Sequence, residues 1–497
     1  MLRPSRTLPR ALRPLAARPS ASLPTSHRFP TSPFRALSLL THTSDTPVFF
    51  NAVSPPSSSS SPSASAGEGG VIPSFRLLTP TGSLSSPSSA AVQKLAASVD
   101  PHTLERLMRV MTTLPVLDQI LYSSQRQGRI SFYMTSYGEE GAVVGSAAAW
   151  ADTDEVFAQY REVGVLLWRG YPLSSLMAQV LSTSSDVATK GRQMPVHYGS
   201  RTHHFHTISS PLGTQFPQAA GAAYALKLRA EKLVKEEGKS EEQAREEAGC
   251  VVCYAGEGAA SEGDWHAGLN MASVLGGPIV FFVRNNGFAI STPSSQQYAG
   301  DGIASRGPGY GIDTLRVDGN DPLAVLVGCR EARRRAVQGQ KPVLVEAMSY
   351  RVGHHSTSDD SSAYRSPADV SSVQKLDSPL FRLRQYLESL PPPSPSSPSS
   401  SSSDGEGAAW WSDAKDAQVK AEAKKAVLAA FSAAERQPRP PLSEMFTDVF
   451  ASLERPQREQ RAELKRLVGK WGGAHEGWRR ELGRFEGGAG AVEEWEE

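Results

Sequence analysis

The chain has 497 residues, is 39% hydrophobic and carries a formal net charge of +1 at pH 7. That much apolar material is enough for one or two large domains. This near-neutral net charge gives no indication of a basic surface for nucleic acids or for a membrane. No apolar run reaches the roughly 18 residues that a membrane-spanning helix needs. Three cysteines are too few for a disulfide framework and favour a reducing compartment.

Residues 1–72 have the composition of a targeting peptide followed by a low-complexity segment. No acidic residue occurs between Met1 and Ser44, while arginine recurs among Ser, Leu, Ala and Pro. This pattern is typical of an organellar transit peptide, and we favour mitochondrial over plastid import; the alternative is a plain basic tail. The Ser/Pro-rich stretch Ser54–Gly70 cannot bury enough apolar surface to fold, so we expect order to begin near Pro73.

The following residues predict an α/β domain over 73–390. A helix is expected from Asp100, which has the N-cap residue type and precedes a proline. Three apolar runs without polar alternation predict buried strands, at 250–255, 278–283 and 341–350. Because helical segments separate such runs, they indicate a parallel sheet covered by helices on both faces.

Three further segments complete the expected organisation. Residues 228–248 are charged almost throughout and are interpreted as a solvated helical insertion. Residues 391–408 form a low-complexity linker, and residues 409–497 form a helical C-terminal tail. The sequence gives no role for the insertion at 228–248 or the linker at 391–408.

A carboxylate and an amide follow two neighbouring strands. Glu257 lies between Gly256 and Gly258, and Asn286 follows the next strand. Because parallel strands of one βαβ unit end at the same edge of the sheet, both side chains should reach one crevice. Carboxylate and amide oxygens suit Mg²⁺, and the start of the next helix suits a phosphate. The stretch therefore predicts a metal–diphosphate site.

The alternatives at this stretch are weaker. The dinucleotide fingerprint G-x-G-x-x-G needs glycine where Ser261 stands. Ser261 with Asp264 resembles a capping box for the helix that follows, which should end at Gly276 and Gly277.

Histidines and cysteines invite two other interpretations. His197, His203, His204 and His206 suggest zinc, but their spacing lacks a close ligand pair, and scaffolding of a loop and of a cofactor site is favoured. Cys250 and Cys253 suggest a redox pair. They lie three residues apart in a predicted strand, so their side chains should face opposite sides.

The sequence resembles the alpha subunit of the branched-chain 2-oxo acid dehydrogenase decarboxylating component, a thiamin diphosphate-dependent family. The resemblance covers roughly Pro73 to the C-terminus apart from the two insertions. Besides GEG and NN at 256–258 and 285–286, the stretches that carry it are SQRQGRISFYMTSYGEEG (Ser124 to Gly141), QYREVGVL (Gln159 to Leu166), KGRQMPVHYG (Lys190 to Gly199), TISSPLGTQ (Thr207 to Gln215), RNNGFAISTP (Arg284 to Pro293), YGIDTLRVDGND (Tyr310 to Asp321) and YRVGHHSTSDDSSAYRS (Tyr350 to Ser366).

The resemblance implies the thiamin diphosphate-binding fold and roles for individual residues. Magnesium would be bound by Glu257, Asn286 and the carbonyl of Phe288, where the family usually has tyrosine. The cofactor would be bound by Tyr160, Arg161, Ser210, Leu212, Gly258, Ala259, Arg284 and His355, with His355 also facing the reacting centre. A potassium ion would be bound by Ser209, Pro211, Thr214 and Gln215. Regulatory phosphorylation would fall on Ser356, with Ser366 a second candidate.

The resemblance further implies oxidative decarboxylation of a 2-oxo acid in the mitochondrial matrix. The acyl unit would pass to the lipoyl group of a partner acyltransferase core. In thiamin enzymes a carboxylate, usually from a second α/β domain, activates the aminopyrimidine. This chain has only one βαβ-rich domain, so the resemblance implies a beta subunit in an α2β2 assembly. A regulatory kinase and phosphatase are the other partners implied; nucleic acid and membrane are not.

Two rival functions stay open. A pyruvate dehydrogenase alpha subunit shares the cofactor, metal and partner, although GEGAASEGD and HHSTSDDSSAYRS favour the branched-chain type. A non-catalytic organising subunit is the other rival, and the intact Glu257, Asn286, Arg161, Arg284 and His355 argue against it. The sequence gives neither the transit-peptide cleavage site nor the ranking of branched substrates, nor whether phosphorylation operates in this organism.

Overall fold

The computed structural model describes residues 43–50, 71–392, 409–492 and 495. The expected transit peptide falls mainly on residues 1–42, outside the described residues. The linker expected at 391–408 also lies outside them, apart from residues 391 and 392. No helix in the described ranges is long and apolar enough to cross a membrane.

An eight-stranded sheet forms the centre of the fold, and every neighbouring pair in it is parallel. Its order is β1-β2-β9-β10-β6-β5-β3-β4. The strands are β1 (Thr43–Ser44), β2 (Ser74–Phe75), β3 (Glu155–Phe157), β4 (Phe205–His206), β5 (Val251–Gly256), β6 (Ile279–Asn285), β9 (Asp313–Asp318) and β10 (Val343–Met348). A separate antiparallel hairpin joins β7 (Phe288–Ala289) to β8 (Thr292–Pro293). The expected parallel α/β architecture is confirmed.

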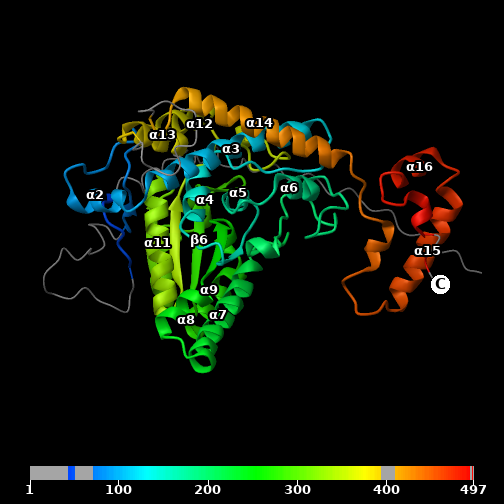
Figure 1. Cartoon of the computed structure of the whole chain (residues 1–497), viewed down its shortest axis with the longest axis horizontal. Helices are drawn as coiled ribbons and strands as arrows, with labels where there is room; N and C mark the ends of the chain where they lie inside the picture. Colours follow the sequence, from blue (N-terminus) through cyan, green and yellow to red (C-terminus); the bar gives the residue numbers. More distant parts are fainter. Residues whose placement is uncertain (1–42, 51–70, 393–408, 493–494, 496–497) are drawn as a thin grey trace, which may run out of the picture. The chain divides into compact units, whose positions relative to one another are not determined.

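Helices cover both faces of this sheet, and Figure 1 shows α11 on one side of β6 with α7 and α9 on the other. The helices of the α/β body are α2 (Ala90–Ala97), α3 (Pro101–Arg126), α4 (Glu140–Ala147), α5 (Val163–Trp168), α6 (Leu173–Val180), α7 (Gln215–Glu237), α8 (Glu241–Ala248), α9 (Gly263–Leu275), α10 (Ser294–Gln297), α11 (Pro322–Gly339), α12 (Pro367–Leu376), α13 (Pro379–Ser389) and α14 (Asp413–Glu435). Both faces are therefore buried, which explains the continuous apolar runs of the central strands.

The side chains of β5 alternate between two hydrophobic clusters. Val252 and Tyr254 pack with α3, α4 and α11, whereas Val251 and Ala255 pack with α7 and α9. Cys250 joins the first cluster and Cys253 the second, and both are buried free thiols. The expectation that the two cysteines face opposite sides of the sheet is confirmed.

Two helix boundaries follow the sequence signals and one does not. Helix α3 begins after Asp100, whose Oδ1 accepts the Thr103 amide at 3.0 Å. Helix α9 ends at Gly276, as expected. The capping box at Ser261 is wrong, because residues 259–261 form a 3₁₀ turn and the backbone of Glu262 caps α9 without a side-chain hydrogen bond.

Order begins earlier than the expected Pro73. Strand β1 pairs in parallel with β2, and Phe50 exchanges backbone hydrogen bonds with Thr314 of β9. The Phe49 ring lies under the guanidinium of Arg335, 4.1 Å from its centroid. Residues 43–50 therefore belong to the folded sheet rather than to the disordered segment.

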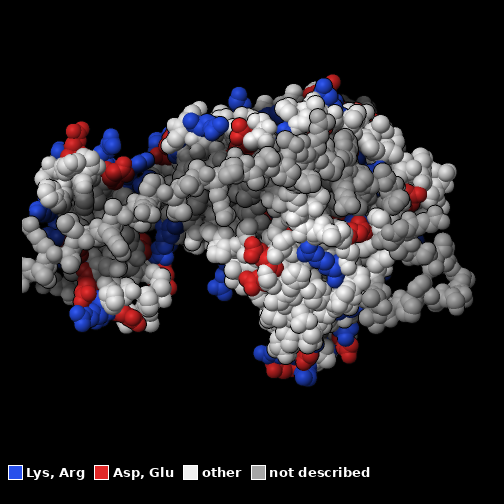
Figure 2. Space-filling model, turned by 180° about the vertical axis from the view of Figure 1, so that it is seen from behind, with Lys and Arg blue, Asp and Glu red and all other residues white. Residues whose placement is uncertain are grey.

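The charged segment 228–248 is continuous with the body. It forms the last turns of α7 and all of α8, and it buries Ala230, Leu233, Ala244 and Ala248 on one side. Its exposed side carries intrahelical ion pairs such as Arg245–Glu241. Figure 2 shows basic and acidic side chains intermixed at this end of the molecule. The segment is thus a half-buried helical hairpin, not a wholly solvated excursion.

The expected helical tail divides into two parts. Helix α14 packs on α3 and adds Val427 and Phe431 to the main core, and Trp411 before the helix joins the same core. Helices α15 (Arg455–Trp471) and α16 (Glu476–Leu482) belong to a separate small cluster, which contains Leu442, Val468 and Leu482. Within the described part of the tail, the residues beyond α14 form a cluster separate from the main core.

Candidate active site

The crevice forms where β5 and β6 end side by side. Their register pairs Gly256 with Arg284, and the Glu257 amide donates to the Arg284 carbonyl at 3.0 Å. Glu257 and Asn286 thus leave the same edge of the sheet, as the parallel topology requires. They line one cavity of about 440 Å³.

This cavity gathers residues from seven separate stretches of the chain, from residues 132–134 to residues 351–355. The sequence-predicted residues that line it are Tyr160, Arg161, Ser209, Ser210, Leu212, Glu257, Gly258, Ala259, Arg284, Asn286, Phe288 and His355. Pro211, Thr214, Gln215, Ser356 and Ser366 do not line it. Three further polar or charged lining residues, Gln159, Glu262 and Arg351, were not predicted from the sequence, and His197 was expected only as scaffolding.

Glu257 is a buried carboxylate in need of a partner. Its side chain is 2% exposed, and its Oε1 atom has no hydrogen-bond partner. Burial raises the pKa of Glu257 to about 7, because the charged form loses its hydration. A bound cation would relieve both penalties, so the carboxylate fits a hard metal ion.

The two glycines beside Glu257 serve different purposes. A Cβ on Gly256 would meet nothing closer than the Arg284 carbonyl at 4.0 Å, so the space beside it is open to a ligand. A Cβ on Gly258 would lie 2.6 Å from the Cβ of Ala289. Gly258 is therefore required first by packing against the β7–β8 hairpin.

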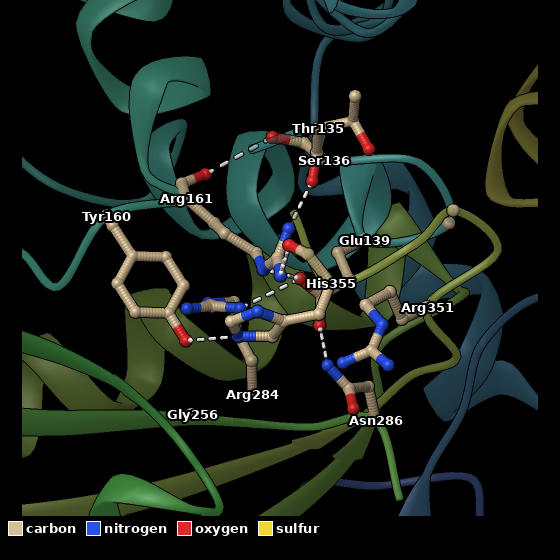
Figure 3. A network of polar contacts seen from close by, with 12 residues as sticks. Thr135, Ser136, Glu139, Tyr160, Arg161, Gly256, Arg284, Asn286, Arg351 and His355 are labelled. Atoms are coloured by element: carbon tan, nitrogen blue, oxygen red, sulfur yellow. Dashed lines mark hydrogen bonds and ion pairs between the residues drawn. The ribbon is translucent and has the colours of Figure 1, made fainter. Parts of the chain in front are cut away.

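The Glu139 carboxylate connects the side-chain amide of Asn286 to the guanidinium of Arg284. Its Oε1 accepts from Asn286 Nδ2 at 2.7 Å, and its Oε2 accepts from Arg284 Nη1 at 2.8 Å. Figure 3 shows the Glu139 carboxylate between these groups, with Arg161 beside it. Burial opposes ionisation, but Arg284 and Arg161 outweigh it and hold the pKa of Glu139 below its usual value. The side chain stays an anion and orients both neighbours.

Glu162 secures the other side of Arg284. Its Oε1 accepts from Arg284 Nε at 2.9 Å, while its Oε2 accepts the backbone amides of Gln159 and Tyr160. Glu139 and Glu162 lie within stretches that carry the family resemblance, but only the tertiary fold reveals their partners.

Arg161 and His355 hold the opposite wall. Arg161 Nη2 donates to the His355 carbonyl at 2.6 Å, and Nη1 donates to the Thr135 carbonyl. His355 Nε2 lies 3.3 Å from the Tyr160 hydroxyl, as Figure 3 shows. Burial, with the charges of Arg161 and Arg351, lowers the pKa of His355 to about 3, so its ring is neutral at pH 7.

The segment after His355 is closed by its own hydrogen bonds. Asp359 Oδ2 accepts the His355 amide at 2.8 Å and the Tyr364 hydroxyl at 2.6 Å. Ser356 is 8% exposed in this arrangement. Ser366 is exposed instead, and its hydroxyl caps α12 by accepting the Ala368 amide at 3.2 Å.

Of the residues expected at a potassium site, Ser209 lines the cavity and the others belong to a hydrogen-bonded turn beside it. Thr214 Oγ1 donates to the Pro211 carbonyl at 3.1 Å. Gln215 Oε1 accepts the Gly213 amide at 3.1 Å, and its Nε2 donates to the Tyr254 carbonyl at 3.3 Å. The turn fixes the loop that carries Ser210 and Leu212 along the cavity wall.

Three of the four histidines considered for zinc lie away from the cavity. His204 and His206 both contact Glu155, at 2.9 and 3.0 Å. The hydrogen bond from His206, with that from His204, lowers the pKa of Glu155 to about 2. His203 contacts Ser200 at 2.7 Å, and only His197 reaches the cavity.

Comparison with known proteins places this chain in a family. Residues 108–391 match the model of the dehydrogenase E1 component. The chain is 50% identical over 405 residues to the mitochondrial 2-oxoisovalerate dehydrogenase subunit alpha of Macaca fascicularis, covering 81% of each chain. It is 48% identical to that of Caenorhabditis elegans, covering 75% of this chain and 78% of the relative. It is 45% identical to subunit alpha 1 of Arabidopsis thaliana, covering 73% and 70%. The chain therefore belongs to the dehydrogenase E1 component family, among the mitochondrial 2-oxoisovalerate dehydrogenase alpha subunits.

Proposed function

We propose that this chain is the alpha subunit of a mitochondrial enzyme that oxidatively decarboxylates branched 2-oxo acids with thiamin diphosphate. The family implies that cofactor, and the names of the relatives imply the substrate class. The observation that carries the proposal is the single cavity in which Glu257, Asn286, Arg161 and Arg284 meet. Such a set of hard oxygen donors beside two guanidiniums suits a metal-bound diphosphate.

Glu257, Asn286 and the Phe288 carbonyl would hold Mg²⁺. The unpartnered Oε1 of Glu257 supports this role, because a buried carboxylate without a partner is costly. Asn286 Oδ1 accepts the Phe288 amide at 3.1 Å, which folds residue 288 back over the amide. The phenylalanine at 288 fits the role, since only the backbone oxygen is needed.

The diphosphate would lie against Tyr160, Arg161, Arg284 and the backbone of Gly258 and Ala259. Arg161 and Arg284 are already oriented by carboxylates and carbonyls, so little side-chain entropy is lost when the anion binds. Ser210 and Leu212 would contact the cofactor rings. Ser209, Pro211, Thr214 and Gln215 would bind K⁺ and brace that loop.

Bound thiamin diphosphate supplies a nucleophilic carbon and an electron sink for the 2-oxo acid. The protein positions the substrate, excludes water and stabilises charge. His355, neutral at its lowered pKa, would offer its ring to the reacting centre. Carbon dioxide leaves, and the acyl group passes to a lipoyl disulfide, which is reduced as the thioester forms.

A complete site needs other proteins. We assign the carboxylate that activates the aminopyrimidine to a beta subunit in an α2β2 assembly, and the lipoyl group to an acyltransferase core. Ser356 and Ser366 are the proposed phosphorylation sites for a regulatory kinase and phosphatase. The proposed destination is the mitochondrial matrix, with residues before Thr43 as transit peptide.

A substrate panel tests the proposal. The chain, started before Thr43 so that β1 is kept, is co-expressed with the matching beta subunit and supplied with thiamin diphosphate, Mg²⁺ and K⁺. Decarboxylation of 3-methyl-2-oxobutanoate should exceed that of pyruvate. Preference for pyruvate would move the chain to the pyruvate dehydrogenase type. Turnover of neither acid by a complex with bound cofactor would favour the non-catalytic subunit.

A further inference from the structure

We infer that His197 is a positioning residue for Ser210, and that the pair presents a fixed hydrogen-bond acceptor to the amino group of the bound cofactor. The inference rests on the proposed function and goes beyond it, because it assigns a role to a side chain that does not itself touch the metal or the diphosphate. Both residues line the main cavity.

The surroundings of His197 determine which ring nitrogen carries the proton. Nδ1 lies 3.0 Å from the Met194 carbonyl and 3.2 Å from the Pro195 carbonyl. Carbonyl oxygens only accept, so Nδ1 must be the donor. In the neutral ring, Nε2 is then left with a lone pair.

That lone pair determines the direction of the Ser210 hydroxyl. Ser210 Oγ lies 2.7 Å from His197 Nε2. A hydroxyl has one proton, and here it is donated to the imidazole. Both lone pairs of Oγ remain for a ligand, so the cavity wall offers an acceptor at this point. The aminopyrimidine of thiamin diphosphate carries an amino group, which is the donor that such an acceptor selects.

The backbone before His197 is held in a conformation that serves this contact. Val196 is buried and has φ of +70°, which is rare for a β-branched residue. Strain of this kind persists only where surrounding structure imposes it, and it gathers at functional sites. Here the turn at Val196 returns the His197 ring onto the carbonyls of Met194 and Pro195.

If His197 had only a structural role, it would act through the contacts of Nδ1 with the backbone carbonyls. If it positions Ser210, it acts through Nε2. Two substitutions distinguish these roles. In His197→Asn, the amide reaches the position of Nδ1 and keeps a donor for the carbonyls, but Ser210 loses its acceptor. In His197→Gln, the amide oxygen reaches the position of Nε2 and still accepts from Ser210. A positioning role predicts that His197→Gln keeps the affinity for the cofactor and His197→Asn does not. A purely structural role predicts the reverse.

The first measurement is the dissociation constant of thiamin diphosphate with Mg²⁺, by calorimetry on the complex with the beta subunit. One lost hydrogen bond should weaken binding roughly five- to tenfold in His197→Asn and in Ser210→Ala. The double variant should be no weaker than either single variant, because the two residues act as one acceptor. His197→Gln should stay within about twofold of wild type.

The second measurement uses oxythiamin diphosphate, which has a carbonyl oxygen in place of the amino group. The fixed acceptor of the wild type should disfavour it. In His197→Asn the Ser210 hydroxyl is free to rotate and donate, so the ratio of the two dissociation constants should fall several-fold. Thermal unfolding of each variant checks that the fold is kept.

Three results would overturn the inference. These are unchanged cofactor affinity in a folded His197→Asn or Ser210→Ala, additive losses in the double variant, and an unchanged preference for thiamin over oxythiamin diphosphate in His197→Asn. If His197→Asn does not fold, Ser210→Ala and His197→Gln still decide the question. Failure of the proposed function is distinguishable, because the substrate panel on the wild-type complex detects it without any substitution at His197 or Ser210.

Discussion

Buried charge at the cavity is balanced residue by residue. Arg161, Arg284 and Arg351 face the carboxylates Glu139, Glu162 and Glu257, and all six are nearly inaccessible to solvent. Breaking such a set by removing one member leaves a buried charge without a partner, which costs about 3–5 kcal/mol. Glu257 is the only carboxylate of the three with a buried oxygen that lacks a hydrogen-bond partner.

The two proposed phosphorylation sites should respond differently to a carboxylate. Ser356→Glu places a charge at a buried position next to His355 and within the loop held by Asp359. Repulsion and desolvation should open the loop and lower kcat/KM about tenfold or more in the assembled enzyme. The measurement is steady-state turnover of 3-methyl-2-oxobutanoate.

Ser366→Glu provides the matched control. Ser366 is exposed at the N-cap of α12, where a negative charge is favourable. Its activity should stay within about twofold of wild type. Equal losses in the two variants would contradict the assignment of the effect to the buried position.

Glu140 offers a prediction about pH. Burial raises its pKa to about 8, with its Oε2 accepting the Gly138 amide. A carboxyl whose pKa is higher in the folded state stabilises the fold below its unfolded pKa, and the contribution is lost as pH rises through the folded value. Wild type should lose about 1 kcal/mol per pH unit relative to Glu140→Gln between roughly pH 5 and 8. The measurement is the free energy of unfolding of both proteins, by chemical denaturation, across this pH range. A constant difference between wild type and Glu140→Gln would contradict a neutral Glu140.

The residues of the site were predictable only where a local pattern carried them. Glu257 and Asn286 follow recognisable strands, so the edge at which they meet could be predicted. Glu139, Glu162 and Arg351 were missed because nothing local distinguishes them from surface charges. Their roles depend on packing between segments that lie up to about two hundred residues apart in the chain.

At the scale of elements, the loss of stability on removing an N-cap side chain should depend on how deeply that side chain is buried. Asp100 caps α3 at the surface, whereas Asp321 caps α11 inside the protein and also accepts the amides of Leu77 and Leu78. Asp100→Ala should cost about 1 kcal/mol. Asp321→Ala should cost roughly 3 kcal/mol or more, because four buried amides lose their acceptor.

Denaturant unfolding of the two variants measures this difference. Thr103→Ala is a suitable reference, since it keeps the Asp100 carboxylate and the Thr103 amide that it accepts. Equal destabilisation by Asp100→Ala and Asp321→Ala would show that the contacts to Leu77 and Leu78 contribute nothing.

Element boundaries were predictable where composition and burial agree. The central strands are apolar throughout and buried on both faces, so the parallel sheet followed from the sequence. Residues 43–50 were missed because a two-residue strand beside a Ser/Pro-rich segment has no periodicity to detect. The capping box at Ser261 failed because Ser261 is the last residue of a 3₁₀ turn, and Glu262 takes the N-cap position of α9.

At the scale of the whole molecule, the chain alone should be inactive. In the cavity, Glu257 is proposed to bind the metal, while Glu139 and Glu162 bind the guanidinium of Arg284. The carboxylate that activates the aminopyrimidine is assigned to a partner. Purified chain with thiamin diphosphate and Mg²⁺ should show no decarboxylation above background, and added beta subunit should restore it. Full turnover by the single chain would contradict the division of the site between subunits.

The most direct test of the account is calorimetric titration of thiamin diphosphate into the assembled complex, with and without Mg²⁺. Glu257→Gln should weaken metal-dependent binding roughly 10- to 100-fold, because the buried anionic ligand is lost. Glu262→Gln, which removes an exposed carboxylate from the same cavity, should bind as wild type does. Unchanged, magnesium-dependent binding by Glu257→Gln would contradict the site on which the proposed function rests.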